Sequence, residues 1–249
     1  PNGPLGSEPI HSGSALFYSR KMKRRGLRSI LAVGNPITDL GPLPASEGEV
    51  RAAAENFSKV RVLTGKKASE TVVKSALGNY DILLFATHGE LLEFSPLLSN
   101  LRFTRSNRDD GKLTVEEIID SKISANLVVL SACESGLGRG WRGRDAPSGD
   151  DLIGLARGFS LAGSPSVVAS LWKVEDESTG KLFRIFFKHL GAKKDKAEAL
   201  RAAQIEMIGA TGTAKTFRGS RGVEERDRIS ISESHPFFWA AFFLFGDWS

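Results

Sequence analysis

Short runs of apolar, largely β-branched residues recur along the chain, and segments with helical periodicity separate them. Several of these runs are apolar throughout and do not alternate with polar positions, which is typical of strands that are covered on both faces. We therefore expect about six strands. They are predicted over residues 28–34, 59–65, 80–89, 125–132, 165–172 and 236–246.

Helical patterns with start signals lie between the expected strands. Ser46 precedes a periodic segment and has Glu49 three residues later, which is a capping-box spacing, and Thr114 has Glu117 at the same distance. Ser69 leads a further helical segment, and more helices are expected over 151–162, 178–190 and 195–208. Because strands alternate with helices, we predict an α/β domain: a central, mostly parallel sheet with helices on both faces.

Three stretches depart from this order. Residues 1–19 are rich in Pro, Gly and Ser, and "GPLGS" at 3–7 resembles the scar of a cleaved expression tag, so we expect a disordered segment there and one domain over 20–249. Residues 136–151 are rich in Gly and Arg and predict a mobile loop. Residues 211–234 are polar and charged and predict an exposed excursion or a disordered linker.

The cysteine content points to a protein of a reducing cellular compartment. The chain of 249 residues has one cysteine, which excludes an internal disulfide framework. There is no apolar signal-peptide region, and the longest apolar stretch, Phe237 to Phe245, is too short to span a bilayer as a helix. We expect a cytoplasmic protein that does not bind membranes.

The net charge of +5 comes largely from a basic cluster at residues 20–28. Such a cluster can bind nucleic acid, but it has no interleaved aromatic residues and no nucleic-acid motif, so a solvated face is the favoured interpretation. The segment "LTGKKAS" lacks the upstream glycine of a phosphate loop, and one cysteine with four scattered histidines gives no zinc spacing. We expect no cofactor and no metal.

Two of the expected strands end in residues that can react together. His88 lies at the end of the strand over 80–89, and Cys133 directly follows the strand over 125–132. Reacting groups in open α/β sheets gather beyond the carboxyl ends of strands, so neighbouring strands would bring both side chains into one crevice. A thiol needs an adjacent base to react, and an imidazole can take its proton and later protonate a leaving amine. A lone cysteine is equally often a buried structural thiol, so both interpretations stay open here.

The local sequence is partly that of a caspase. The histidine precedes the cysteine by roughly the caspase interval of about 50 residues, and Ala132 directly precedes Cys133. The glutamine of the caspase signature is replaced by Ser131, and a glycine follows only at Gly136. The chain is therefore not a caspase proper.

Longer strings make the resemblance specific. In chain order these are "GNPITDLGPLPASEGEV", "DILLFATHGE", "SPLLSNLRF", "LTVEEIIDSKISANLVVLSACESGLG", "GLARGFSLAGSPSVVASLWKVED" and "HPFFWAAFFLFGDW". Together they closely resemble the CHAT domain, a caspase-like peptidase domain that often follows tetratricopeptide repeats in bacterial proteins. The resemblance covers residues 28–248.

This resemblance implies a caspase-like sandwich and a cysteine endopeptidase of the caspase, separase and gingipain type. Cys133 matches the family's nucleophile and His88 its general base, acting as a dyad through an acyl-enzyme. The backbone N–H groups of Gly89 and Cys133 would form the oxyanion hole, because fixed donors stabilise charge that develops on the scissile carbonyl oxygen.

The resemblance also implies where the substrate is selected. The segment 169–178, with Leu171 and Trp172, would line the pocket for the residue before the cut, and Asp176 would recognise a basic side chain there. Asp39, in the loop after the first strand, is the second candidate for this acid. Glu175 and Glu177 remain open as well, and all acids near 176 have an alternative role in the first turn of a helix.

Two classes of function follow. The first is a cysteine endopeptidase that cleaves a protein or peptide after a basic residue and is regulated by a partner or by fused tetratricopeptide repeats. The second is a catalytically silent interaction module that keeps the fold; retention of both Cys133 and His88 favours the enzyme. Arginines within 136–151 would suit self-cleavage, although a plain surface loop is the favoured interpretation. Direct nucleic-acid binding ranks last.

Overall fold

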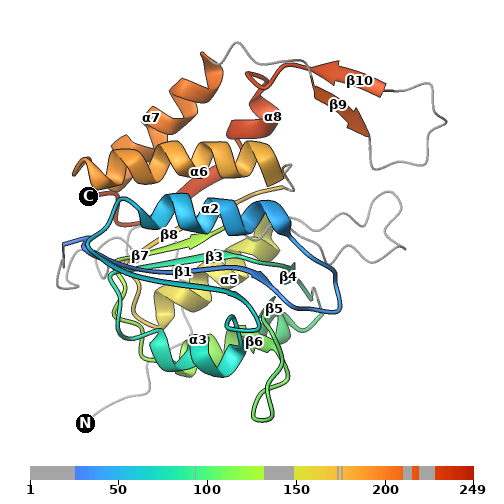
Figure 1. Cartoon of the computed structure of the whole chain (residues 1–249), viewed down its shortest axis with the longest axis vertical. Coiled ribbons are helices and arrows are strands. Elements are labelled where there is room, and N and C mark those ends of the chain that lie inside the picture. Colours follow the sequence, from blue (N-terminus) through green and yellow to red (C-terminus); the bar gives the residue numbers. More distant parts are fainter. Residues whose placement is uncertain are drawn as a thin grey trace, which may run out of the picture.

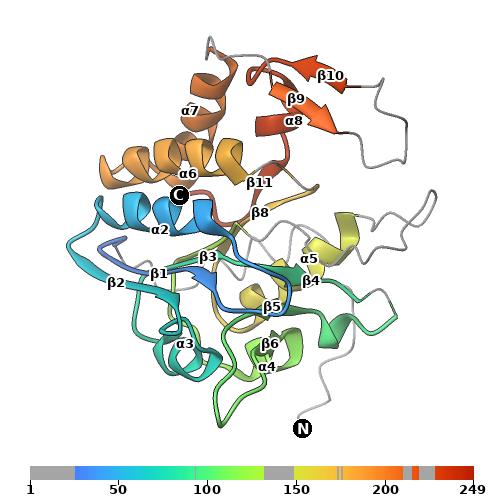
Figure 2. The same ribbon diagram turned by 45° about the vertical axis from the view of Figure 1, so that its right-hand side comes forward.

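The computed structural model describes residues 26–92, 94–131, 149–172, 174, 176–209, 215–218 and 228–249. Its main sheet contains β1 (Ser29–Pro36), β2 (Lys59–Gly65), β3 (Ile82–Ala86), β7 (Leu127–Leu130), β8 (Ser166–Ser170) and β11 (Phe242–Gly246). The strand order is β11-β8-β7-β3-β1-β2, and β11 alone is antiparallel to its neighbour; Figures 1 and 2 together label these strands. The predicted sheet of six mostly parallel strands is confirmed.

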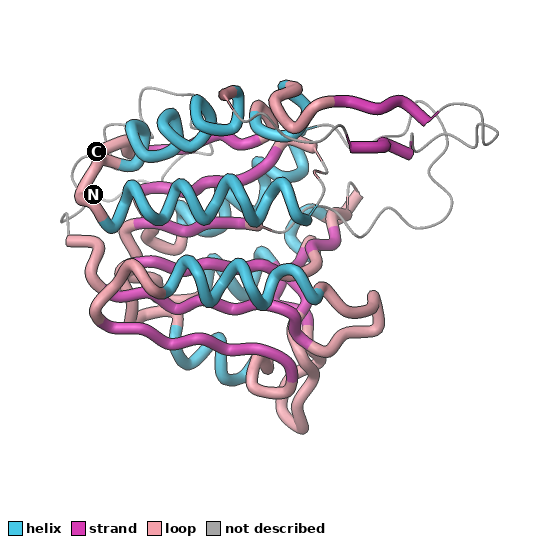
Figure 3. The backbone as a smooth tube through the Cα atoms, turned by 45° about the horizontal axis from the view of Figure 1, so that its top comes forward, coloured by secondary structure: helices cyan, strands magenta, loops and turns pink. Residues whose placement is uncertain are grey.

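Helices cover both faces of this sheet, as predicted (Figures 1 and 3). One face packs against α2 (Pro44–Ala54), α6 (Asp176–Gly191) and α7 (Lys196–Ile208). The other packs against α3 (Glu70–Ala76), α4 (Val115–Asp120) and α5 (Gly149–Leu161). No helix among the described residues has the length and apolar character needed to cross a bilayer.

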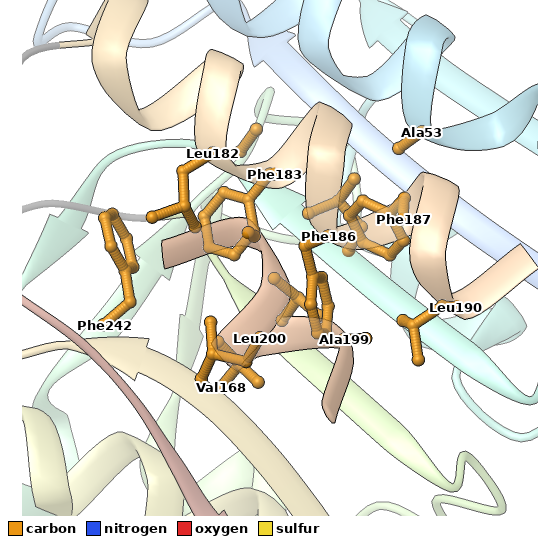
Figure 4. Close-up of a cluster of buried hydrophobic side chains, with 14 of the residues drawn as sticks. Ala53, Val168, Leu182, Phe183, Phe186, Phe187, Leu190, Ala199, Leu200 and Phe242 are labelled. Carbon is orange, nitrogen blue, oxygen red and sulfur yellow. The ribbon is translucent and has the colours of Figure 1, made fainter. Parts of the chain in front are cut away.

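Alternation along each strand builds two separate cores. In β3, Ile82, Leu84 and Ala86 join the core under α2, α6 and α7, whereas Leu83 and Phe85 join the opposite core. The first core is dominated by aromatic and aliphatic side chains of α6 that meet β11 (Figure 4). It includes Leu182, Phe183, Phe186, Phe187, Leu190 and Phe242. Burial of these large side chains supplies much of the driving force for docking α6 on the sheet.

The helix starts agree with the sequence in two places and differ in one. Thr114 and Glu117 form the predicted capping box, and Ser69 is the N-cap of α3. The capping role predicted for Ser46 is wrong, because α2 begins two residues earlier, at Pro44. Proline fixes φ at a helical value and is favoured in the first turn, so it starts the helix before Ser46. The Ser46 hydroxyl instead accepts a hydrogen bond from the Asn35 N–H at 2.8 Å.

The apolar run over 236–246 is not a single strand. Its first part forms α8 (Pro236–Trp239), and only the residues from Phe242 onward form β11. The reason is again local, since Pro236 occupies the first helical position and the Nδ1 atom of His235 accepts a hydrogen bond from the Phe237 N–H.

Two segments expected to be irregular contain regular structure. The antiparallel strands β9 (Lys215–Arg218) and β10 (Arg228–Ile231) lie within 211–234, so the described part of this predicted excursion or linker contains paired strands. The last residues of the predicted loop 136–151 belong to α5, which starts at Gly149. Residues 1–19 and the rest of that loop lie outside the described residues.

A small antiparallel sheet is inserted between β3 and α4. It consists of β4 (Gly89–Glu90), β5 (Asn100–Arg102) and β6 (Lys112–Thr114), with the short 3-10 helix η1 (Pro96–Leu98) between β4 and β5. Its strands are only two or three residues long, which is too short to leave a recognisable pattern in the sequence. It begins immediately after His88 and therefore shapes that residue's surroundings.

Candidate active site

The strands that lead to His88 and Cys133 are neighbours, as the predicted crevice requires. Strands β3 and β7 are parallel, Phe85 is in register with Leu130, and the Ser131 N–H donates to the Phe85 carbonyl at 2.9 Å. His88 is the third residue after Phe85, and Cys133 is the third residue after Leu130. Cys133 lies outside the described residues, so its pairing with His88 stays a prediction.

The edge where these strands end is the natural place for a ligand. The chain passes from β1 to β2 on one side and then returns to place β3 on the other side of β1. Crevices outside the carboxyl ends of strands at such a switch point are the usual binding sites of open α/β sheets. The loop after β1 and strand β4 come together at this edge (Figure 2).

His88 is buried, with 5% of its surface exposed, and its ring is held by the loop after β1. The Nε2 atom lies 2.9 Å from the carbonyl oxygen of Gly41. A carbonyl oxygen accepts and never donates, so Nε2 carries the proton in this bond. In the neutral ring this leaves Nδ1 as the nitrogen that can accept a proton. The contact therefore selects both the tautomer and the orientation of the imidazole.

The loop 37–43 presents the Gly41 carbonyl through a turn that favours glycine. Gly41 has a φ of +95°, a region in which a side chain is strained. The ends of the loop are fixed by backbone donors: the Ile37 N–H binds the Thr104 hydroxyl at 2.8 Å, and the Leu43 N–H binds Asn35 Oδ1 at 2.8 Å. The loop is thus anchored on both sides of the residue that contacts His88.

The small sheet orients the backbone of Gly89. The His88 carbonyl accepts a hydrogen bond from the Arg102 N–H at 2.8 Å, and Gly89 is in register with Leu101. Hydrogen-bonded and non-hydrogen-bonded pairs alternate along an antiparallel ladder, so the Gly89 pair is of the second kind. Its N–H group therefore points to the side opposite β5.

Arg102 is a buried cation next to His88, and its role was not predicted from the sequence. Its guanidinium donates to Asp39 Oδ1 and, at 3.2 Å, to Glu90 Oε2. The hydrogen bond from Arg102 lowers the pKa of the Asp39 carboxyl below its ordinary value. Asp39, the second candidate for substrate recognition, is thus ion-paired with an arginine of its own chain. Nothing in the local sequence marked Arg102, whereas the glycine-containing loop after the first strand gave a weak signal for Gly41.

The residues predicted to select the substrate follow β8. The Leu171 N–H donates to the Ala241 carbonyl at 2.8 Å, and 39% of the Leu171 surface is exposed. Trp172 donates from Nε1 to the Phe237 carbonyl at 3.0 Å, which ties it to α8. Asp176 begins α6, and its side chain lies outside the described structure, as does Glu175.

The sheet order separates the two halves of the predicted site. Strand β7 lies between β3, which leads to His88, and β8, which leads to Leu171 and Trp172. All three strands run parallel, so their carboxyl ends share one edge of the sheet.

A pocket between α6 and α7, lined by residues such as His189 and Arg201, contains none of the predicted site residues. Among the described residues, no group of three or more His, Cys, Asp and Glu side chains is placed to hold a metal ion.

Comparison with known proteins gives both a family and relatives. The model of the CHAT domain family matches residues 8–247. Tetratricopeptide repeat protein 28 of Mus musculus is 25% identical over 243 residues, which cover 83% of this chain and 9% of that protein. The protein of the same name in Homo sapiens is also 25% identical, with 8% of its length covered. The chain thus spans less than a tenth of either relative.

Solved structures with similar folds include two proteins of low sequence identity. The Arg-specific cysteine proteinase gingipain R is 11% identical, with a TM-score of 0.49 over 89% of this chain and 46% of that chain. The Saccharomyces cerevisiae separase–securin complex contains a chain that is 17% identical, with a TM-score of 0.47 over 94% of this chain and 13% of that chain.

Proposed function

Because the chain belongs to the CHAT domain family, we propose that it is a cysteine endopeptidase in which Cys133 is the nucleophile and His88 the general base. One observation carries the proposal. His88 is buried at the end of the strand next to the one that leads to Cys133, and the Gly41 carbonyl holds its Nε2 proton. Nδ1 is then the nitrogen that can receive the thiol proton.

The reaction follows from these roles. The Cys133 thiol transfers its proton to Nδ1 of His88, and the thiolate attacks the scissile carbonyl carbon. The resulting oxyanion is stabilised by the backbone N–H groups of Gly89 and Cys133. His88 then protonates the leaving amine, which breaks the peptide bond and leaves a thioester on Cys133. A water molecule, deprotonated by His88, hydrolyses the thioester and restores the thiol.

The proposed preference is for a basic residue before the cut. Asp176 is the acid assigned to this pocket, with Trp172 and Leu171 on its wall. Asp39 is the weaker choice, because its carboxylate is already paired with Arg102. Glu175 and Glu177 are the further alternatives to Asp176.

The setting of the enzyme is also a proposal. The curated relatives are named tetratricopeptide repeat proteins, so repeats on the same polypeptide or a separate partner would regulate the site. The single cysteine fits a cytoplasmic location.

The test is digestion of a peptide library by the wild type, Cys133→Ala and His88→Ala, read by mass spectrometry. We expect cleavage after Arg or Lys that both variants lose. His189→Ala is the matched control, because this histidine pairs with Glu206 and should not affect cleavage. Cleavage after other residues that both variants lose would support the dyad but contradict the assignment of Asp176 to a pocket for basic side chains.

Absence of cleavage is resolved by labelling Cys133 with a thiol-reactive probe at mildly acidic pH. A Cys133 thiol that His88 activates reacts under these conditions, whereas a thiol without an activating base does not. Failure of both cleavage and labelling would contradict the peptidase and favour a silent interaction module.

A further inference from the structure

We propose that Arg102 is a positioning residue for His88: through its ion pair with Asp39, it holds the loop 37–43 where the Gly41 carbonyl binds the imidazole. The catalytic consequence rests on the proposed peptidase function. The structural consequence, a fixed tautomer of His88, can be measured without any catalysis.

The guanidinium of Arg102 is held in one place. Only 9% of the Arg102 side chain is exposed, and its two terminal nitrogens reach carboxylates from different segments, Asp39 in the loop and Glu90 on β4. Glu90 Oε2 also accepts a hydrogen bond from the Asn100 amide at 3.2 Å. A buried charge is costly unless it is paired, so Arg102 stabilises the arrangement in which both carboxylates stay close.

The backbone of Arg102 is hydrogen-bonded to His88 and to the residue before it, Thr87. The Arg102 N–H donates to the His88 carbonyl at 2.8 Å, and the Arg102 carbonyl accepts from the Thr87 hydroxyl. Arg102 therefore joins the backbone at His88 to the loop that binds the His88 ring. The connections close a ring: His88 backbone, Arg102, Asp39, Gly41, and back to His88 Nε2.

The middle of the loop depends on this pair. Its ends are anchored at Ile37 and Leu43. The hydrogen bonds within the loop are local, such as the one from the Leu40 N–H to the Thr38 hydroxyl at 3.3 Å. Within the described part of the chain, the Asp39–Arg102 pair is the one side-chain hydrogen bond that joins the middle of this loop to the small sheet, and Lys112 on β6 adds a weaker attraction to the same carboxylate. Without this pair, the Gly41 carbonyl loses its fixed distance from Nε2.

The experiment is ¹⁵N NMR of the imidazoles in the full chain carrying Cys133→Ala. We expect His88 to be the Nε2–H tautomer in this background. Asp39→Asn and Arg102→Gln should each convert His88 to a mixture of tautomers. The double variant should change the tautomer no further, because each single variant already removes the same Arg102–Asp39 connection. Asp39→Glu keeps the carboxylate and should retain most of the Nε2–H form.

The matched control is Glu206→Gln. Glu206 pairs with His189 at 2.7 Å, so this variant should alter the His189 resonances and leave His88 unchanged. Because Asp39 is 72% exposed, Asp39→Asn should fold even if the buried Arg102→Gln does not. An unchanged His88 tautomer in Asp39→Asn would overturn the proposal.

Kinetics in the Cys133 background complete the test. A displaced imidazole should lower kcat by up to about a hundredfold with little change in KM, whereas loss of a substrate-binding acid would raise KM for basic substrates. Altered KM with an unchanged tautomer would reject the positioning role and assign Asp39 to the substrate. A changed tautomer in a chain that neither cleaves peptides nor reacts with the thiol probe at Cys133 would support the positioning role and contradict the peptidase.

Discussion

At the scale of single residues, the candidate site depends on backbone groups as much as on side chains. The Gly41 carbonyl fixes the His88 ring, and the ladder between β4 and β5 turns the Gly89 N–H away from β5. Neither contribution needs a particular side chain. Both need a backbone conformation, and for Gly41 that conformation is one that glycine adopts without strain.

Substituting Gly41 should affect function more than stability. Gly41→Ala has free space for the added methyl group, so its cost is the strain of a positive φ, about 1 kcal/mol, relieved by a shift of the loop. We expect a small fall in Tm and a clear loss of kcat. Gly48→Ala is the control, because this residue lies in α2 with equally free space and alanine there should raise Tm. Normal kcat in Gly41→Ala would contradict the role of the carbonyl.

At the scale of elements, one lysine joins three segments under the sheet. The Lys74 ammonium on α3 binds Glu70 at 3.2 Å, Asp109 at 3.0 Å and Glu117 at 2.9 Å. Burial opposes its charge, but these carboxylates outweigh burial and raise the pKa of Lys74 above its ordinary value. Because Glu117 also caps α4, the lysine connects α3, the loop before β6 and the start of α4.

The same network should make stability depend on pH through Asp109. Hydrogen bonds from Thr71 and Lys74 lower the pKa of Asp109 below its ordinary value. A carboxyl whose pKa is lower in the folded state stabilises the fold above about pH 4, and this contribution is lost as pH falls through the folded pKa. Asp109→Asn should therefore cost about 1.5–3 kcal/mol near pH 7 and progressively less below pH 4.

Urea denaturation of the wild type and Asp109→Asn at a series of pH values measures this effect. The exposed Asp120→Asn on α4 serves as the comparison and should give only a small difference in stability from the wild type near pH 7. A constant gap between the wild type and Asp109→Asn from pH 7 to pH 3 would show that the charge of Asp109 contributes nothing.

At the scale of the whole molecule, β11 closes the sheet at the edge next to β8. It ends at Gly246, which has a φ of +95° and whose backbone lies against Pro165. A methyl group on Gly246 would come within 2.1 Å of the Pro165 carbonyl oxygen, so the strand would have to move. Strand β11 in turn covers the aromatic side chains of α6, and the ring centroids of Phe183 and Phe242 lie 5.0 Å apart.

Gly246→Ala should consequently destabilise the entire domain. The clash and the positive φ together should cost about 3 kcal/mol or more, lowering the unfolding midpoint in urea. Gly154→Ala in α5 has open space around the added methyl group and should leave the midpoint equal or higher. Equal midpoints for both variants would show that the end of β11 contributes little to stability.

The sequence predicted what depends on local pattern. The six strands and the capping box at Thr114 follow from apolar runs and short spacings, whereas the pairing of β3 with β7 comes from the strand order that the structure shows. The contacts that hold His88 join residues far apart in the chain, as Arg102 does with Asp39, and no local pattern records them. Ser46 was misplaced because a proline two residues earlier decided the helix start. The position of His88 at a strand end was therefore predictable from the sequence, whereas the contacts that support its imidazole were not.

The antiparallel edge has a consequence for how the protein is made. β8 is synthesised before α6, α7 and α8, yet its outer partner β11 follows all three helices, and Phe242 pairs with Ser170. Until β11 leaves the ribosome, the backbone N–H and C=O groups along one side of β8 have no partner, and the aromatic face of α6 is only partly covered. An open strand edge beside uncovered aromatic rings is a template for pairing with the wrong chain. We therefore expect folding of this domain to be completed only when β11 pairs with β8, and the nascent polypeptide to be prone to mispairing until then.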